Sequence, residues 1–218
     1  MIDLHTHTFF SDGELGPAEL VRRAAVAGYR ALAITDHADQ CNIVSLIERL
    51  RPVVIELGEA NGLTLLAGAE LTHVPPKMIA EVVRMAREAG AQILSVHGET
   101  IVEPVIEGTN RAAIEAGVDI LAHPGLISVE DVQLAAKKGV FLEVTTRKGH
   151  SLTNGHVVKL ALQYGARLVV NNDAHAPGDL LSFEMARKVA LGAGMTSAQF
   201  DEAQANSLEL VKRGEHAA

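Results

Sequence analysis

A repeated pattern of a glycine followed by an apolar run constrains the fold of this chain more than any other feature. Glycine just past a helix supplies the left-handed conformation that other residues resist, so each glycine predicts a helix end. The run behind it has the near-continuous apolar character of a parallel strand covered on both faces. The glycines are Gly28, Gly62, Gly90, Gly117, Gly139 and Gly165, and the runs are 31–35, 63–67, 91–96, 118–122, 140–144 and 166–170.

Stretches of helical character lie between the apolar runs. Pro17 and Pro76 open two of them, at first-turn positions where the missing N–H of proline costs nothing. With an opening strand, the chain has seven strands alternating with helices, which predicts a parallel sheet. Seven unbroken units favour closure into an α/β barrel over an open doubly wound sheet. The expected helices are 17–27, 42–61, 76–89, 109–116, 129–138, 154–164, 181–193 and 197–212.

Length and composition limit the class of protein. A chain of 218 residues with 48% hydrophobic content suits a single domain over 1–218, with 181–218 as its terminal helices. No apolar run approaches the roughly 18 residues of a membrane span, and the N-terminus lacks a basic leader segment. One cysteine, Cys41, excludes an internal disulfide framework and a cysteine-rich zinc site. We therefore expect a cytoplasmic protein without a membrane partner.

The opening strand carries two histidines, His5 and His7. Because alternate side chains of a strand share a face, Asp3, His5 and His7 are expected to point the same way. Two residues of strand span about 6.5–7 Å, which is close enough for both imidazoles to reach one ion.

Other histidines and carboxylates recur near the ends of the predicted strands, where parallel barrels place their active sites. Scattered surface histidines and mid-strand core histidines would not gather there. Imidazole and carboxylate ligands without thiolate suit Zn²⁺, Mn²⁺ or Fe, and nine ligands are too many for one ion. The sequence thus predicts two or three ions at the C-terminal face, near His5, His7, Asp12, His37, Glu70, His97, His123, Asp173 and His175.

Seven ordered motifs resemble those of the PHP family, which is named after polymerases and histidinol phosphatases. The resemblance runs from Asp3 to about Ala190 and implies a distorted (β/α)7 barrel that carries three divalent metals and hydrolyses phosphate esters. The motifs are His5-Thr6-His7, Ser11-Asp12-Gly13, Thr35-Asp36-His37, Gly68-Ala69-Glu70, His97, Ala122-His123-Pro124-Gly125 and Asn172-Asp173-Ala174-His175.

The resemblance also implies a role for each matched residue. One metal would be held by His5, His7, Glu70 and Asp173. Glu70 would bridge to a second metal held by His97 and His123, and the third would be held by Asp12, His37 and His175. Glu70 and Asp12 are the carboxylates expected to be catalytic. The position of Asp12 is a histidine in some relatives, which leaves the metal preference open.

Other polar residues are candidates to contact the substrate or to orient ligands. Arg147 and Lys148 follow the sixth strand and would clamp a phosphate, unless they are solvated loop charges. His150, in the same loop, is a candidate proton donor to the leaving alcohol. Asp3 and Asp36 are candidates to orient ligand imidazoles. Glu143 is expected to contact substrate or to hydrogen-bond within the site, whereas we interpret His73, His156 and His216 as surface residues.

We prefer hydrolysis of a small phosphomonoester, as in histidinol phosphatases, over three alternatives. A nuclease normally needs a cationic groove and stacking aromatics, but this chain has a formal charge of −8 and 3% aromatic residues. Three bound divalent cations would offset six of those charges, so nucleic acid is not excluded. An amidohydrolase usually has a lysine where this chain has His97, and the full ligand set argues against a metal-free scaffold. The substrate and the oligomeric state stay open.

Overall fold

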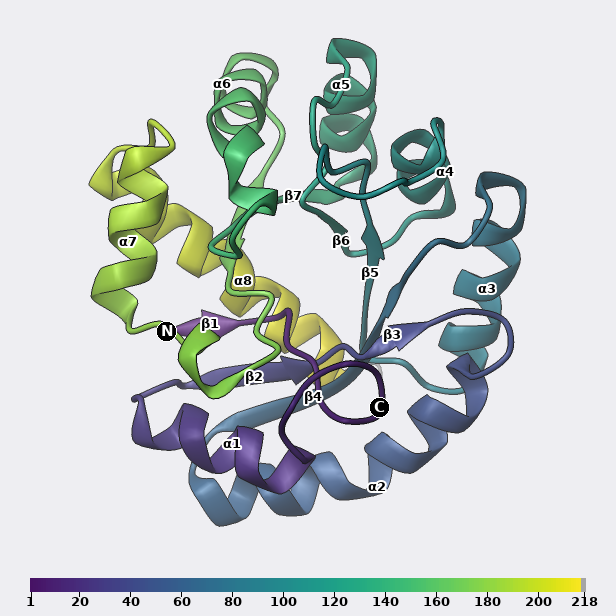
Figure 1. The fold of residues 1–218 in the computed structure, drawn as a ribbon, viewed down its shortest axis with the longest axis vertical. Coiled ribbons are helices and arrows are strands. Elements are labelled where there is room, and N and C mark those ends of the chain that lie inside the picture. Colours follow the sequence, from purple (N-terminus) through teal and green to yellow (C-terminus); the bar gives the residue numbers. More distant parts are fainter. Residues whose placement is uncertain (217–218) are drawn as a thin grey trace.

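Seven parallel strands form a nearly closed ring in the computed structural model, which describes residues 1–216 (Figure 1). A short strand, β3 (His37–Ala38), pairs with β4 outside the ring. The arrangement confirms the prediction of a single α/β barrel. In ring order the strands are β1 (Ile2–Asp3), β2 (Ala31–Ile34), β4 (Thr64–Leu71), β5 (Ile93–His97), β6 (Ile120–Ala122), β7 (Phe141–Thr145) and β8 (Leu168–Asn171).

The ring closes between its first and last strands without a regular ladder. One isolated parallel bridge joins Thr6 to Ala174, and the His7 amide donates to the carbonyl oxygen of Ala174 at 2.8 Å. The Leu4 amide donates to the side-chain oxygen of Asn171 at 2.9 Å. A side chain therefore takes the place of a backbone partner here, and β1 is shorter than the sequence predicts.

Helices follow the strands and surround the ring. The six glycines of the sequence pattern all have positive φ, between 71° and 93°, as their role at helix ends requires. None of the eight α-helices within residues 1–216 is both long enough and apolar enough to cross a membrane. The helices are α1 (Pro17–Val26), α2 (Ile43–Asn61), α3 (Pro76–Glu88), α4 (Thr109–Ala116), α5 (Val129–Lys138), α6 (Asn154–Tyr164), α7 (Phe183–Gly192) and α8 (Ser197–His216).

Strand β4 extends further than its apolar run predicts. Its last four residues pair with β5, and the last two also pair with β3: Glu70, for example, lies between His37 of β3 and Ser95 of β5. Glu70 is consequently a strand residue with a fixed backbone and does not begin a loop. Pairing across the sheet, which no local pattern records, causes this difference.

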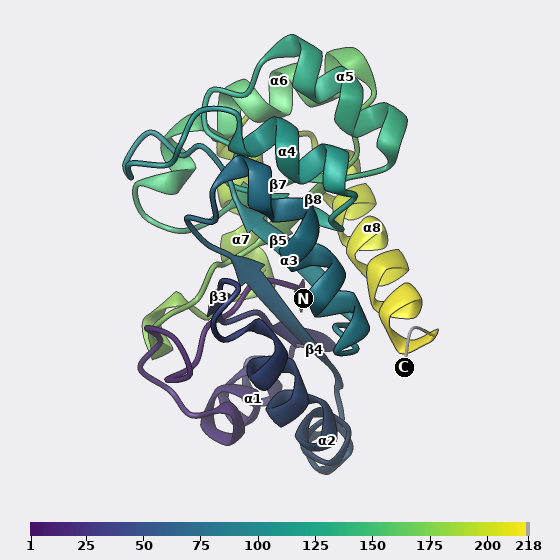
Figure 2. The ribbon, with the colours of Figure 1, turned by 90° about the vertical axis from the view of Figure 1, so that its right-hand side faces the viewer.

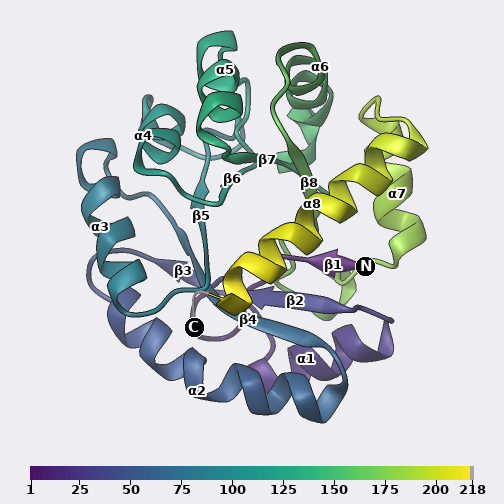
Figure 3. The same cartoon turned by 180° about the vertical axis from the view of Figure 1, so that it is seen from behind.

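Helix α8 closes the N-terminal end of the ring (Figure 3). Leu210 and Val211 of α8 join an interior cluster built from the first residues of the strands. In the side view, α8 lies along one side of the barrel and the loops after β1 and β8 lie on the opposite side (Figure 2). The other residues of this cluster are Ile2, Leu4, Ala31, Ala33, Leu66, Ile93, Ile120, Phe141 and Val169.

Polar contacts fix α8 in this position. The guanidinium of Arg167 lies 4.3 Å from the centre of the Phe141 ring and also pairs with Glu209 of α8. Asn206 accepts from Arg167 at 2.7 Å and donates to the carbonyl oxygen of Leu168 at 2.9 Å. The N-terminal end of the barrel is sealed, so only the opposite face is open for chemistry.

We predict that Leu210→Ala lowers the free energy of unfolding by about 2–5 kcal/mol, because it leaves a cavity in this cluster. Leu210 is 2% exposed. Denaturant unfolding followed by circular dichroism measures the change. The matched control is Leu191→Ala on α7, where the side chain is 39% exposed and we expect a loss below about 1 kcal/mol. Equal losses in the two variants would contradict a sealing role for α8.

Candidate metal centre

The nine predicted ligands converge at the carboxyl ends of the strands. The loop after β1 and the segments after β6 and β8 bring their side chains to those of β3, β4 and β5. Six of the nine are almost fully buried, and only Asp12, His37 and His175 reach the solvent. The structure therefore places the predicted residues together, from segments spread over the whole chain.

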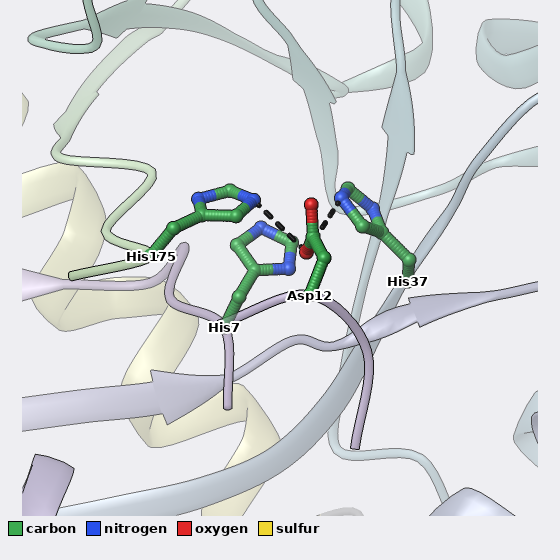
Figure 4. Close-up of side chains that lie close together, drawn as sticks. All are labelled: His7, Asp12, His37 and His175. Carbon is green, nitrogen blue, oxygen red and sulfur yellow. Dashed lines mark ion pairs between the residues drawn. The ribbon is translucent and has the colours of Figure 1, made fainter. Parts of the chain in front are cut away.

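Asp12 lies between two imidazoles at the outer edge of the cluster (Figure 4). One of its oxygens is 3.3 Å from His37 Nε2 and 3.1 Å from His175 Nε2. The ring of His7 stacks on His175 with centroids 4.0 Å apart. Ligand atoms of these four residues all lie within 4.8 Å of one another, so a cation could be shared among them. The Asp12 side chain is 58% exposed, which makes this the most accessible group.

Glu70 lies at the middle of the cluster. Its Oε1 is 3.4 Å from His5 Nε2 and 3.3 Å from His123 Nε2. Its Oε2 is 2.9 Å from His37 Nδ1 and 3.8 Å from His7 Nε2. One buried carboxylate thus contacts four imidazoles from three different segments, which is the arrangement expected of a bridging ligand.

Asp173, which follows β8, contacts the imidazoles of His7 and His123. Its Oδ1 lies 3.2 Å from His7 Nε2, and its Oδ2 lies 3.6 Å from His123 Nε2. Asp173 and His123 both have positive φ, 52° and 26°, a conformation that side chains with a Cβ rarely adopt. Backbone strain of this kind is often found at functional sites, and here it occurs at two polar residues of the cluster.

His97 does not contact Glu70, with which it was expected to share the second metal. Among the described residues, Glu70 has no oxygen within 4.0 Å of a His97 nitrogen, and His97 Nε2 lies 3.1 Å from Glu103 Oε2 instead. Glu103 was not predicted, because it lies in a loop with no motif around it. His150 is 5% exposed and stacks on His123 with centroids 4.3 Å apart. His150 is thus part of the cluster.

Glu143 orients two elements of the cluster. Its Oε1 accepts from His5 Nδ1 at 2.9 Å and from the side-chain Nδ2 of Asn171 at 2.8 Å. Its Oε2 accepts from the backbone amide of His123 at 3.1 Å. Glu143 is fully buried, so these contacts hold it in one position. Of the two roles expected from the sequence, hydrogen bonding within the site is the one observed.

Asp3 and Asp36 bind backbone amides and hydroxyls. Asp36 accepts from the amide and the hydroxyl of Thr8 and from the hydroxyl of Ser11, which fixes the loop that carries Asp12. Asp3 accepts from the backbone amide of Asn172 at 3.1 Å. Among the described residues, neither carboxylate hydrogen-bonds to a ligand imidazole, so both fix the loops that carry the ligands and do not orient the rings directly.

Three other predicted residues lie around the cluster. Arg147 is partly exposed, and its Nη1 donates to the carbonyl oxygen of Asp173 at 3.3 Å while its Nε is 3.6 Å from Asp173 Oδ2. Lys148 is exposed. His73, expected at the surface, is 47% exposed but lies 3.6 Å from Glu103 Oε2. Arg147 is consequently the one cation of this loop held at the edge of the cluster.

Burial and charge push the pKa values of this cluster in opposite directions. Burial lowers the pKa of His7 to about 3. Burial would also lower the pKa of His37, but the carboxylates of Asp12 and Glu70 outweigh it and raise that pKa to about 10. Burial would raise the pKa of Glu70, yet the charge of His5 and hydrogen bonds from neighbouring imidazoles hold it well below its ordinary value. Ionised carboxylates beside imidazoles are the donor set that binds cations.

Two observations indicate that this cluster can bind divalent cations. First, several buried polar atoms lack a hydrogen-bond partner among the described residues, which is costly unless another group binds them. Second, two ligand atoms on one tetrahedral zinc ion lie about 3.3–3.4 Å apart, given metal–ligand distances of about 2.0–2.1 Å. The carboxylate–imidazole distances given above for Glu70 Oε1 and Asp12 match that spacing. The unpartnered atoms include His5 Nε2, both ring nitrogens of His7, Glu70 Oε1, His123 Nδ1 and Asp173 Oδ1.

Curated relatives cover nearly the whole chain. An uncharacterized protein of Methanocaldococcus jannaschii is 49% identical over 214 residues, 97% of this chain and 98% of the relative. A probable phosphatase of Thermoanaerobacter sp. strain X514 is 29% identical over 90% of this chain and 87% of the relative. The DNA polymerase/3'-5' exonuclease PolX of Bacillus subtilis is 27% identical over 79% of this chain, but over only 34% of the polymerase.

Solved structures share the fold at low sequence identity. The ochratoxinase of A. niger superposes with a TM-score of 0.63 at 13% identity, over 95% of this chain and 70% of that protein. This likeness extends to the fold alone. The model of the PHP domain matches residues 3–115, which is more than half of the chain and contains six of the nine predicted ligands. The chain therefore belongs to the PHP domain family.

Proposed function

We propose that this protein is a metal-dependent phosphoesterase that hydrolyses small phosphomonoesters. One observation carries the proposal: buried carboxylates and imidazoles at the spacing of shared metal ligands, next to an arginine at the open edge. The similarity to a relative named a probable phosphatase supports it. We propose no particular alcohol as the leaving group.

The proposed centre holds up to three ions of Zn²⁺, Mn²⁺ or Fe. His5, His7, Glu70 and Asp173 would hold the first, and Glu70 would also bind the second together with His97 and His123. Asp12, His37 and His175 would hold the third, most weakly, because Asp12 is largely exposed. When bound, such cations acidify a water molecule into a nucleophile and neutralise phosphate charge.

Neighbouring side chains hold the proposed ligands in position. His5 donates from Nδ1 to Glu143, which leaves Nε2 free to act as a ligand. Asp36 holds the loop of Asp12 through Thr8 and Ser11. We propose Arg147, which lies beside Asp173 at the edge of the cluster, as the residue that clamps the phosphate, because arginine favours bidentate contacts with phosphate oxygens.

A nuclease is the second candidate, because the polymerase relative is named an exonuclease and matches 79% of this chain. Phe9 and Phe10 are exposed side chains close in sequence to Asp12 and could stack on bases. The net charge of −8 opposes the binding of a polyanion. We therefore keep the monoester as the preferred substrate.

We predict that Glu70→Gln lowers turnover by on the order of a hundredfold or more while the fold is retained, because the bridging carboxylate loses its charge. The assay uses an aryl phosphate with metal-reconstituted protein, and elemental analysis counts ions per chain. Wild-type protein should hold up to three. Glu59→Gln, an exposed position on α2, is the control. A near wild-type rate with a full set of ions would contradict the bridging role, and only traces of metal in the reconstituted wild type would refute the centre.

We predict that Glu143→Gln weakens metal binding by about 10- to 100-fold, since a glutamine cannot accept all three hydrogen bonds with a negative charge. Competition against a coloured chelator measures the affinity. Circular dichroism tests that the variant is folded. Unchanged affinity in a folded variant would show that orientation of His5 by Glu143 is not needed.

We predict that Arg147→Ala lowers kcat/KM for monoesters by about 10- to 100-fold, because a charged hydrogen bond to phosphate is lost. Metal content should stay the same. The exposed Arg84 of α3, which pairs with Glu81 and Glu88, provides the control Arg84→Ala. In the same assay at moderate salt, wild-type protein should hydrolyse an aryl phosphate faster than a short oligonucleotide. Faster release of nucleotides than cleavage of any monoester would favour the nuclease.

A further inference from the structure

Two side chains beside the proposed second ion, His150 and Glu103, have no role among the metal ligands proposed so far. His97, His123 and His150 bring one ring nitrogen each within 4.8 Å of the others. All three residues are at most 5% exposed. Three buried imidazoles that share one small space do not serve a hydrophobic core, and they would repel one another if protonated.

A carboxylate contacts two of these three imidazoles from the solvent side. Glu103 places Oε2 3.1 Å from His97 Nε2 and Oε1 3.4 Å from His150 Nε2. These distances match the spacing of about 3.3–3.4 Å between two ligands on one tetrahedral ion. Glu103 thus contacts two of the three imidazoles with separate oxygens, in the way expected of a carboxylate that ligates a cation between them.

The loop that carries Glu103 is held by its own hydrogen bonds. Glu99 Oε1 accepts from the backbone amides of Gly108 and Asn110 at 3.0 and 2.8 Å. In return, Asn110 Oδ1 accepts from the Glu99 amide at 3.0 Å and its Nδ2 donates to the carbonyl oxygen of Pro124. The loop after β5 is therefore tied to helix α4 and to the segment after His123, so the position of Glu103 is built into the fold.

His150 is oriented for ligation in the same manner. Its Nδ1 lies 2.8 Å from the hydroxyl of Thr100, which is 4% exposed. A bond from Nδ1 leaves Nε2 as the free ring nitrogen, and Nε2 is the atom that lies near Glu103. Gly149, with φ of 87°, turns the loop after β7 directly before this residue.

We propose that His150 and Glu103 are additional ligands of the ion bound by His97 and His123. With Glu70, the ion would then have three imidazoles and two carboxylates as donors, a mixed set that suits Zn²⁺ or another borderline transition metal. This inference rests on the proposed metal centre and adds two ligands to its second ion. The loops after β5 and β7 would then both contribute ligands to that ion. We therefore expect it to be bound more tightly than the ion near the exposed Asp12.

The test uses the full chain, stripped of metal and reloaded with Zn²⁺ or Co²⁺. After dialysis against a graded series of chelator concentrations, we expect His150→Ala and Glu103→Ala to lose one ion per chain at a chelator activity at least about tenfold lower than wild type does. Their Co²⁺ forms should show altered visible absorption, because the ligand set changes. The matched controls are Glu107→Ala in the same loop and His216→Ala on α8, both exposed, and these should behave as wild type.

Two results would overturn the proposal. One is an unchanged ion count, affinity and Co²⁺ spectrum in both variants. The other is a loss of phosphatase activity in His150→Ala with metal binding unchanged, which would make His150 a substrate contact. If an alanine variant does not fold by circular dichroism, His150→Gln and Glu103→Gln keep the side-chain volume and are measured in its place. A wild type that binds ions but hydrolyses no phosphoester would refute the proposed function and leave this ligand assignment standing.

Discussion

The contact between the buried carboxylate of Glu70 and the imidazoles around it is the constraint on which the rest of the structure depends. An ionised group taken out of water must be paired, or it destabilises the fold. Glu70 is paired with His5 and His123 through one oxygen and with His37 through the other. For these segments to meet, the chain has to close around the carboxylate, and a ring of strands is one arrangement that brings them together.

The barrel separates two tasks between its ends. At the N-terminal end, apolar side chains and α8 exclude water, and Arg167 ties α8 to the ring through Phe141. At the other end the same strands carry charged side chains, and loops supply the remaining contacts. A strand such as β4 serves both tasks, because Leu66 faces the sealed interior cluster and Glu70, four residues later, lies in the polar one. The residues that stabilise the barrel and the residues of the polar cluster therefore lie on the same strands, but at opposite ends of them.

The sequence predicted the parts of the fold that local patterns determine. Glycines at helix ends and apolar runs located six of the seven ring strands, the opening residues indicated the other, and histidines near strand ends indicated the polar cluster. Glu103 could not be predicted, since its place depends on the bonds of Glu99 and Asn110, which are set by tertiary packing. The approach of His73 to Glu103 was missed for the same reason. The added length of β4 follows from pairing with β3 and β5, which leaves no periodic signal in a single strand.

The junction between the first and last strands gives the polar cluster a mechanical role. One bridge and a few hydrogen bonds join β1 to β8, fewer than a full ladder would supply. Side chains from both sides of that junction meet just above it, with His5 and His7 on one side and Asp173 on the other. A cation bound by these residues would connect the two sides of the gap in the ring. Its binding free energy would then oppose the separation of β1 from β8, so that ion occupancy and barrel closure would be thermodynamically linked.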